Sequence, residues 1–545
     1  MSAAPRRVVV VGGGVAGLAT AALLAADGHD VELVEKNAEL GGRAGSWEAD
    51  GFRFDTGPSW WLMPEVFDHF FRLLGTTTEE QLDLVRLDPG YRVFFEGETA
   101  SVDVAADEER NRAIFEGIEE GAGDELAAYL ATARETYEMA VERFLYTSFD
   151  TPGAYAAPAV LAHGPRLAGL LTRSLQSHVA SRFSDRRLQQ VLGYPAVFLG
   201  SSPERTPAMY HLMSWLDLAD GVRYPDGGFT RFVEVLARLA RERGARLRTG
   251  ATVTQVLTAP RRTGSPLDRR RAEVTGVRLR DADGEEHVLP ADVVVSATDL
   301  HHVETTLLPR DLQTFPQAFW DKAVSGPGAV LVYLGVRGEL PELAHHSLFF
   351  TEDWKSNFDA IFEQPTRVPT PASIYVCKPS ATDDAVAPEG HENVFVLVPV
   401  PPDPGLGRGG LDGAGDPEIE ATADRAIALV AEWAGVPDLA ERVVVRRTVG
   451  PADFVADVNA WSGGALGPAH TLRQSAFFRA GNRSRKVEGL YYAGHSTVPG
   501  IGLPMCVISA ELVLKRLRGD RSVGRSPEPG PAPEHAPAPR VDDRV

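Results

Sequence analysis

The amino-terminal stretch of this chain limits its fold more than any other part. Residues 8–11 are four consecutive valines, an apolar β-branched run typical of a buried parallel strand. The glycine-rich run 12–17 follows at once and fits G-x-G-x-x-G, and the alanine- and leucine-rich residues 18–26 predict a helix. A second strand is predicted over 31–34, with Glu35 at its end. This order of elements predicts a Rossmann-type nucleotide-binding unit.

Each glycine of the motif has a physical task in such a unit. Gly12 permits a tight turn, Gly14 lets a pyrophosphate approach the backbone, and Gly17 lets the helix pack close to the strand. The N-terminus of the helix faces the phosphates. Glu35 is placed to accept hydrogen bonds from a ribose. The alternative is a glycine-rich turn without a ligand, and the complete series of elements argues against it.

Length and composition narrow the remaining possibilities. The chain has 545 residues, too many for one hydrophobic core, so two or more domains are expected. Lysine and arginine number 55 against 75 aspartates and glutamates, and a net charge of −20 argues against a nucleic-acid partner. Cys377 and Cys506 cannot form a disulfide framework, so a reducing compartment is expected. No stretch is predicted to span a bilayer, because the glycines of residues 8–26 fit the nucleotide fold better.

The pattern further along indicates an α/β fold, in which a nucleotide-binding domain is interrupted by an α+β substrate domain. The predicted elements are strands over 82–104, mainly helices over 108–218, a helix at 229–243, strands within 245–257, 291–298 and 489–494, and a helix at 504–517. The nucleotide-binding domain is assigned to residues 1–85, 225–305 and 485–518, and the substrate domain to residues 86–224 and 306–484. Residues 260–271 are expected to form a mobile basic hairpin, and the proline-rich tail 519–545 to be disordered.

Two further stretches carry functional predictions. A Gly-Gly-Arg turn at 41–43 follows the second strand, and Arg43 could reach a phosphate or a flavin edge; the alternative is a surface arginine. The segment 166–192 has an apolar residue at every fourth position and five arginines against one aspartate, the composition of an interfacial helix. A helix packed inside the substrate domain explains that segment equally well. The apolar positions are Leu167, Leu171, Leu175, Val179 and Phe183.

Three separated blocks of the chain, residues 8–59, 221–257 and 485–517, resemble the bacterial-type phytoene desaturases of the flavin amine oxidase superfamily. The third block contains the most discriminating piece, a P-G-x-G-x-P turn at 499–504. The resemblance implies FAD as cofactor and an oxidoreductase that dehydrogenates a carotenoid polyene, phytoene-type desaturation toward lycopene. It also implies a cytoplasmic enzyme attached peripherally to the membrane surface.

The resemblance assigns cofactor contacts by position. They are Gly12, Gly14, Ala16 and Gly17 at the pyrophosphate, Glu35 at the adenosine ribose, Arg43 beside the cofactor, the Val253 backbone at the adenine, and Gly494 and Met505 near the ribityl and ring ends. The chain departs from the family at His495 and Ser496, where small residues are common, and at Val498, where a histidine is frequent. These departures leave the exact reaction open. His495 is a candidate acid or base, and its alternative is a hydrogen-bonded loop histidine.

The chemistry of a polyene hydrocarbon limits what the protein must supply. Dehydrogenation removes a hydride equivalent from an allylic carbon, so the protein supplies position, dryness and a route for the remaining proton. The aromatic stretches 60–63 and 198–199 are candidates for an apolar tunnel lining, with ordinary core as the alternative. The adjacent pairs His301-His302 and His345-His346 are not expected to converge on a metal, so no metal is predicted. No second nucleotide motif is present, and we therefore expect a quinone or oxygen as electron acceptor.

Two other functions remain open at this point. Related flavoenzymes isomerise or oxygenate carotenoids on the same frame, so a carotene isomerase or ketolase is the first alternative. The second alternative is a non-enzymatic prenyl- or lipid-binding module on this fold. The complete glycine fingerprint with Glu35 argues against that module.

Overall fold

A five-stranded parallel sheet lies at the centre of the computed structural model, which describes residues 4–149, 164–261, 268, 270–364 and 366–529. All four neighbouring pairs of strands run parallel. The spatial order is β20 (Leu490–Tyr492), β13 (Val293–Ser296), β1 (Arg7–Val11), β2 (Asp30–Val34) and β9 (Arg246–Arg248). Because β1 is central and covered on both faces, every position from 8 to 11 must be apolar, and this explains the valine run.

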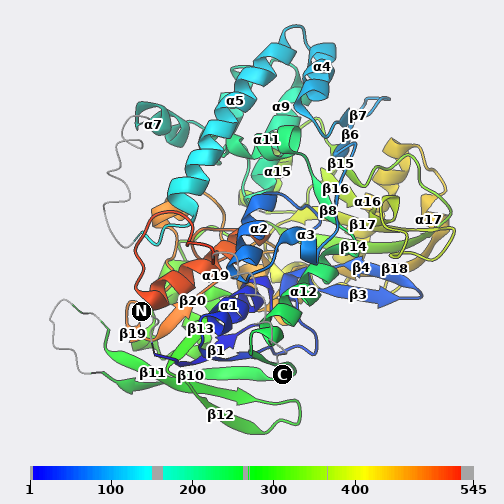
Figure 1. Ribbon diagram of the computed structural model, residues 1–545. Coiled ribbons are helices and arrows are strands. Elements are labelled where there is room, and N and C mark those ends of the chain that lie inside the picture. The colour runs from blue at the N-terminus through cyan, green and yellow to red at the C-terminus, as the bar shows by residue number, and fades with distance from the viewer. Residues whose placement is uncertain (1–3, 150–163, 262–267, 269, 365, 530–545) are drawn as a thin grey trace, which may run out of the picture.

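The two faces of this sheet are covered by different layers, as Figure 1 shows. Val8 and Val10 pack in one core cluster with three helices, whereas Val9 and Val11 pack with an antiparallel sheet. The helices are α1 (Val15–Ala26), α12 (Gly228–Glu242) and α19 (Leu503–Arg518), and the antiparallel strands are β10 (Thr252–Pro260), β11 (Ala272–Arg280) and β12 (Glu286–Pro290). The predicted Rossmann-type α/β fold is thus confirmed, while the domain boundaries stay a prediction.

A mixed seven-stranded sheet forms the second large layer. Its strands in spatial order are β18 (Val443–Val449), β14 (Gly328–Arg337), β17 (His391–Val400), β16 (Ile374–Cys377), β15 (His346–Phe350), β6 (Tyr91–Phe95) and β7 (Val102–Val104). Side chains alternate along β14: Val332 and Leu334 pack with helix α16 (Pro417–Ala434), whereas Leu331 and Tyr333 pack with Phe54 of the amino-terminal region. The second face of this sheet is therefore turned toward the residues that follow the glycine motif.

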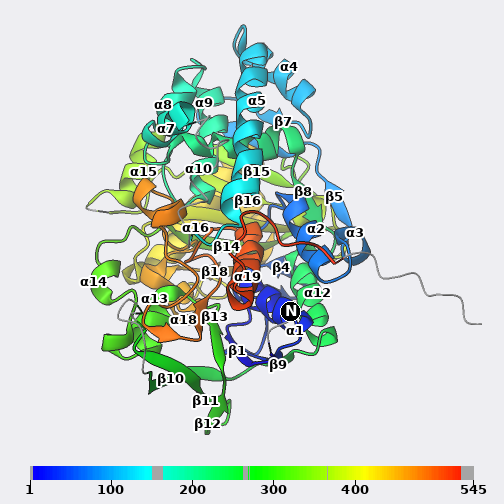
Figure 2. The same cartoon turned by 60° about the vertical axis from the view of Figure 1, so that its left-hand side comes forward.

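Helices and small strands complete the fold. In both Figure 1 and Figure 2, α5 (Ala122–Ala140) runs from the outer helical region toward α19. Tyr137 of α5 and Leu512 of α19 belong to one core cluster. Further elements are β3 (Ser46–Ala49), β4 (Phe52–Asp55), α2 (Pro64–Leu73), α3 (Thr78–Gln81), β5 (Leu84–Arg86), α4 (Glu108–Ile118), α10 (Pro195–Phe198), α11 (Met213–Trp215), β8 (Arg223–Pro225), α13 (Leu300–His302), α14 (Gln317–Trp320), α15 (Trp354–Phe362), α17 (Leu439–Arg442), α18 (Pro451–Val458) and β19 (Val487–Glu488).

The prediction of one interfacial helix over residues 166–192 is wrong. The segment forms three short helices, α7 (Gly164–Thr172), α8 (Leu175–Ala180) and α9 (Arg186–Gly193). The side chains of Ser174 and Asp185 accept hydrogen bonds from the backbone at the starts of α8 and α9, and so favour the breaks.

The apolar stripe of this segment is mostly core. Leu175, Val179 and Phe183 are each at most 1% exposed and pack in the core of the helical region. Three of the five arginines have acidic partners, in the pairs Arg182–Glu125, Arg186–Glu352 and Arg187–Asp185, and Arg173 donates to the Ser177 carbonyl. The side chains of Arg166 and Leu167 lie outside the described residues.

The tail after Gly519 also differs from the prediction over its described part. Residues 522–526 contact α19, because polar groups of this helix take partners from the tail backbone. The Lys515 ammonium donates to the carbonyl oxygens of Ser522 and Gly524, and the Ser526 N–H donates to the Glu511 carboxylate. Residues 530–545 lie outside the described part.

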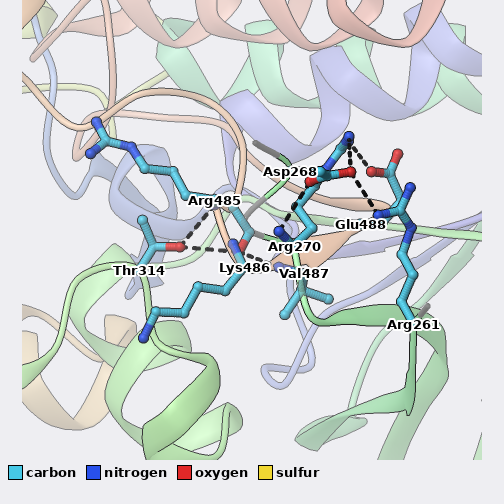
Figure 3. A network of polar contacts seen from close by, with 9 residues as sticks. Arg261, Asp268, Arg270, Thr314, Arg485, Lys486, Val487 and Glu488 are labelled. Carbon is cyan, nitrogen blue, oxygen red and sulfur yellow. Dashed lines mark hydrogen bonds and ion pairs between the residues drawn. The ribbon is translucent and has the colours of Figure 1, made fainter. Parts of the chain in front are cut away.

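The predicted hairpin 260–271 is described only in part, since residues 262–267 and 269 lie outside. Figure 3 shows its two ends joined by charge: Arg261 and Arg270 both bind Asp268, and Arg270 also pairs with Glu488 next to β11. The two arginines hold the pKa of Asp268 far below its usual range. This network braces the antiparallel sheet, and none of these four residues lines the cavity described below.

Among the helices of the described residues, none has both the length and the apolar composition that crossing a bilayer requires.

Candidate functional site

A cavity of about 1090 Å³ takes its lining from the Rossmann-type unit, the seven-stranded sheet and the helical region. The glycine motif, Glu35 and the start of β10 contribute its polar lining. The seven-stranded sheet contributes Tyr333 and Phe395. A largely apolar part follows, lined by side chains such as Leu62, Met63, Phe144, Leu145, Leu212, Met213 and Leu216. The cavity thus joins a nucleotide-binding motif to a long apolar chamber.

The fold brings almost all of the predicted site residues to this cavity. The residues that line it are Gly12, Gly14, Ala16, Glu35, Arg43, Val253, Gly494, His495 and Met505. Gly17 does not appear in the lining, because it lies against the strand side of α1. A Cβ at Gly17 would lie 1.9 Å from the Gly12 carbonyl oxygen, which explains why only glycine fits there.

The glycine loop forms a cradle with the Gly-Gly-Arg turn. Gly12 has a φ of +103°, a conformation that side chains disfavour. The Gly41 N–H donates to the Gly13 carbonyl at 2.9 Å, so the two turns lie side by side. A Cβ on Gly14 would approach only Gly41 and Gly42, at 3.6 Å and 3.9 Å. Gly14 therefore owes its small size to the cavity rather than to protein packing.

Glu35 serves the loop as well as the cavity. Its carboxylate is buried and accepts hydrogen bonds from the Gly13 N–H at 2.6 Å and the Asn37 N–H at 2.8 Å. The Ala251 N–H donates to the Glu35 carbonyl, which places Val253 of β10 beside the same end of β2. Each carboxylate oxygen keeps a second lone pair for a ligand in the cavity.

Arg43 is not a surface arginine. Its Nε donates to the Ala465 carbonyl at 2.9 Å, while its Nη2 is buried and has no hydrogen-bond partner among the described residues. Burial lowers the pKa of this guanidinium, and the nearby Asp299 opposes that shift. A buried cation with a free donor beside a glycine cradle suits an anionic or strongly polar ligand atom.

His495 lies in a polar corner of the cavity together with Asp299. The His495 Nε2 is 3.7 Å from the Asp299 carboxylate and 3.1 Å from the Ser496 hydroxyl. Burial, assisted by the positive charge of Arg43, lowers the pKa of His495 to about 4. The imidazole is therefore neutral near pH 7 and can accept a proton but not donate one as an acid.

Asp299 is a site residue that the sequence analysis missed. It is 2% exposed, caps α13 through the His301 N–H and accepts from the Trp461 N–H. Its signal was available in the sequence, because it follows the buried strand β13 at the carboxyl end of a parallel sheet. Ligands of such sheets bind at that end.

The candidate tunnel residues divide between lining and core. Trp60, Leu62 and Met63 line the cavity, as do Phe198 and Leu199. Trp61 is fully buried instead, with its ring 4.0 Å from that of Phe67. Neighbouring residues point in different directions here, which residue type alone could not have indicated.

The expectation that His345 and His346 do not converge is wrong. One donor atom of each lies with the Cys377 sulfur in a buried group, and all three atoms are within 4.8 Å of one another. His345 precedes β15, so strict strand alternation does not separate its ring from that of His346. Burial lowers the pKa of His345 to about 3 and raises that of Cys377 to about 12.

Comparison with known proteins decides the family. The family model described as flavin containing amine oxidoreductase matches residues 15–513. The chain belongs to this flavin amine oxidoreductase family. Three curated relatives of this flavin amine oxidoreductase are a carotenoid 3,4-desaturase from Haloarcula japonica (42% identical, 94% of this chain and 98% of the relative), a zeta-carotene-forming phytoene desaturase from Myxococcus xanthus (36%, 94% and 94%) and a phytoene desaturase from Fusarium fujikuroi (31%, 95% and 90%).

Solved structures of low sequence identity share the fold of this flavin amine oxidoreductase. An oxidoreductase from Methanosarcina mazei is 16% identical with a TM-score of 0.59, covering 93% of this chain and 100% of that one. A putrescine oxidase bound to putrescine is 15% identical with a TM-score of 0.57, covering 94% and 99%. The family membership identifies a flavin as the cofactor class and the protein as an oxidoreductase.

Replacing Glu35 with alanine is expected to weaken flavin retention and to lower stability together. The ligand would lose charge-assisted hydrogen bonds of roughly 1.5–3 kcal/mol, and two buried N–H groups would lose their acceptor. Flavin released during gel filtration and the thermal midpoint of the apo-protein measure the two effects. Unchanged flavin retention in Glu35→Ala would exclude Glu35 as a ligand.

Lowering the pH from 6.5 to 4 is expected to destabilise the protein through His495. The folded-state pKa of about 4 lies below the unfolded value of 6.5, so the unfolded state binds the proton first. The contribution of neutral His495 to the free energy of unfolding is fully present above pH 6.5. About 3 kcal/mol of it is lost as the pH falls from 6.5 to 4. Denaturant unfolding of wild type and His495→Gln at several pH values isolates the contribution. If the unfolding free energies of the two proteins changed equally with pH, His495 would not be the source of the loss.

Proposed function

We propose that this flavin amine oxidoreductase is an FAD-dependent carotenoid desaturase, which introduces carbon–carbon double bonds into a polyene. The continuity of the glycine cradle with an apolar chamber carries the proposal. Three relatives with desaturase names, matched over nearly the whole chain, support the same substrate class.

The residues of the cavity fit FAD in their chemistry. Gly12, Gly14 and Ala16 would hold the pyrophosphate at the N-terminus of α1, which has no side-chain cap, while Gly17 would act only through its close packing against Gly12. Glu35 would accept from the ribose, Arg43 would use its free Nη2 beside the cofactor, and Val253 would meet the adenine. Gly494 and Met505, at the end of β20 and the start of α19, would contact the flavin half. When bound, FAD supplies the acceptor for a hydride equivalent from an allylic carbon.

The protein itself orients the substrate, excludes water from the cavity and accepts the proton. Each desaturation removes two hydrogens from adjacent carbons, one as a hydride equivalent and one as a proton. The apolar walls orient a chain that has no polar handle, and they exclude water. The neutral His495 would receive the proton at Nε2, and the Asp299 carboxylate at 3.7 Å would stabilise the imidazolium.

The proposal is tested by incubating the purified protein with phytoene in liposomes and an electron acceptor. The absorption spectrum is expected to move to longer wavelength as the conjugated system lengthens. A change of isomer without lengthening would identify an isomerase, and incorporated oxygen would identify a ketolase. A colourless protein that binds polyene but cannot be reconstituted with FAD would support the non-enzymatic module.

The Haloarcula japonica relative favours a second, narrower candidate. That relative is named a carotenoid 3,4-desaturase. Under this alternative the protein acts on an already conjugated carotenoid at its 3,4 position. Parallel assays with phytoene and with a conjugated acyclic carotenoid distinguish the two, because only the preferred substrate is consumed.

We infer a quinone or oxygen as the electron acceptor, since the G-x-G-x-x-G motif at residues 12–17 joins a strand directly to a helix, whereas the other match, at residues 405–410, lies in the long loop between β17 and α16. Rapid-mixing measurements of flavin reoxidation with either acceptor decide between them. Reoxidation only by an oxidised nicotinamide, which would accept the hydride from the reduced flavin, would contradict this inference.

Peripheral attachment to a membrane at the mouth of the cavity is expected to depend on Phe477 and Phe478. These side chains are 54% and 56% exposed and also line the cavity, with Leu472 nearby at 44%. Moving a phenylalanine from water into a bilayer contributes about 1.5–3 kcal/mol. The double variant Phe477→Ser/Phe478→Ser should therefore bind vesicles at least about tenfold more weakly in co-sedimentation.

The matched control is Leu411→Ser/Val444→Ser, which changes two exposed apolar residues that do not line this cavity. It should bind vesicles as wild type does. Equal binding of all three proteins would reject attachment through the cavity mouth.

A further inference from the structure

A second cluster of reactive side chains lies behind the wall of the cavity. His345, His346 and Cys377 are 5%, 0% and 2% exposed, and their donor atoms are gathered within 4.8 Å. The pairing of β15 with β16 explains the geometry, because His346 lies directly opposite Cys377 in the antiparallel register. None of these residues lines the cavity, so the proposed desaturation leaves the cluster unexplained.

The two imidazoles have a free nitrogen each. His345 uses its Nδ1 with the Thr382 hydroxyl at 2.7 Å, and His346 uses its Nδ1 with the Tyr375 hydroxyl at 2.8 Å. The Nε2 of both rings is buried without a hydrogen-bond partner in the part of the chain that the structure describes. Two buried ring nitrogens without a partner, beside a free thiol, are costly unless a ligand satisfies them.

We propose that His345, His346 and Cys377 form a binding site for a cuprous ion. Two imidazole nitrogens and one thiolate are a soft, three-ligand set of the kind that suits copper. Structural zinc almost always takes four ligands, and the described residues gather only three here. A single positive charge on the ion and a single negative charge on the thiolate cancel, which suits a dry site.

Binding requires a small, balanced rearrangement. Metal–nitrogen and metal–sulfur bonds of about 2.0–2.3 Å put donors about 3.5–4 Å apart, so the three atoms close by about 1 Å. The Cys377 thiol releases its proton to solvent as the copper–sulfur bond forms, and copper keeps its oxidation state. The Thr382 and Tyr375 hydroxyls hold the Nδ1 atoms of the two rings, as the outer hydrogen-bond partners of metal-bound histidines do, and the Tyr375 hydroxyl also contacts the Cys377 side chain. Trp60 stacks on His346 at 4.7 Å and so joins the site to the cavity wall.

The test uses purified full-length holoprotein and Cu⁺ itself. Copper is supplied anaerobically with a coloured Cu⁺ chelator as competitor, and bound metal is counted by mass spectrometry. We expect one copper per chain, with one sulfur and two nitrogen neighbours in X-ray absorption. The Cys377→Ser variant should lose this copper, while Cys506→Ser, which removes the other cysteine, should keep it.

A second variant guards against misfolding of Cys377→Ser. Thr382→Val leaves all three ligands in place and should weaken Cu⁺ binding by about 10–100-fold. Flavin content and thermal midpoint report whether each variant is folded. Copper uptake that is indifferent to both Cys377 and Thr382 would overturn the site. Stoichiometric Zn²⁺ binding at the same residues that Cu⁺ cannot displace would overturn the choice of metal.

Discussion

A Gly14→Val variant is expected to fold and yet to bind its flavin about ten- to a hundredfold more weakly. Gly14 has a φ of −74° and a ψ of 177°, which valine adopts without strain. A Cβ there meets Gly41 and Gly42 only at ordinary contact distances, so the protein itself has room. The added methyl groups would instead occupy the cradle at the N-terminus of α1. Overpacking of this kind costs about 1–3 kcal/mol.

The measurements are FAD affinity by fluorescence quenching and apo-protein stability by thermal unfolding. Gly117→Val is the matched control, because nothing lies within 4 Å of a Cβ on Gly117, which lies on α4. That control should bind flavin normally. Full flavin affinity in folded Gly14→Val would place the pyrophosphate elsewhere.

An Arg43→Met variant is expected to lower the affinity for the flavin without lowering the stability of the apo-protein. The buried guanidinium nitrogen Nη2 has no hydrogen-bond partner among the described residues, so removing it relieves the apo-protein of an unsatisfied buried donor, although Asp299 loses the attraction of a nearby cation. The lost bond to Ala465 offsets part of this gain. With ligand present, the charge-assisted contact disappears, and flavin affinity should fall about tenfold or more, equivalent to about 1.5–3 kcal/mol.

We therefore expect the apo-form of Arg43→Met to be no less stable than the wild-type apo-protein, and its affinity for the flavin to be clearly lower. Arg182→Met is the control, since Arg182 pairs with Glu125 outside the cavity. Its flavin affinity should be unchanged and its stability slightly lower. An Arg43→Met protein that unfolds more easily but keeps its flavin would give Arg43 a purely structural role.

Local patterns predicted the sheet and its glycine cradle well. The valine run, the glycine spacing and Glu35 all act over short distances along the chain, where backbone conformation follows from residue type. The segment 166–192 shows the limit of such reasoning. A four-residue apolar repeat demands burial, but it does not say whether core or membrane provides it, and here Leu175 and Val179 face the core.

Most of the residues predicted to contact the cofactor line the cavity, whereas Asp299 and two exposed phenylalanines were not predicted. Asp299 and His495 lie far apart along the chain. The parallel pairing of β13 with β20 brings them together. The sequence analysis did not single out Phe477 and Phe478, and only the folded surface leaves them exposed beside the cavity.

The sequence by itself determined the nucleotide-binding unit, because turns, helix starts and strand burial depend on neighbouring residues. Tertiary structure alone decided which distant side chains meet. His345 and His346 lie with Cys377 because β15 and β16 pair in one register. Arg43 keeps a free donor because the surrounding fold buries it without supplying a second acceptor. Such outcomes follow from long-range packing, in which burial and strand register, rather than local residue type, select the partners.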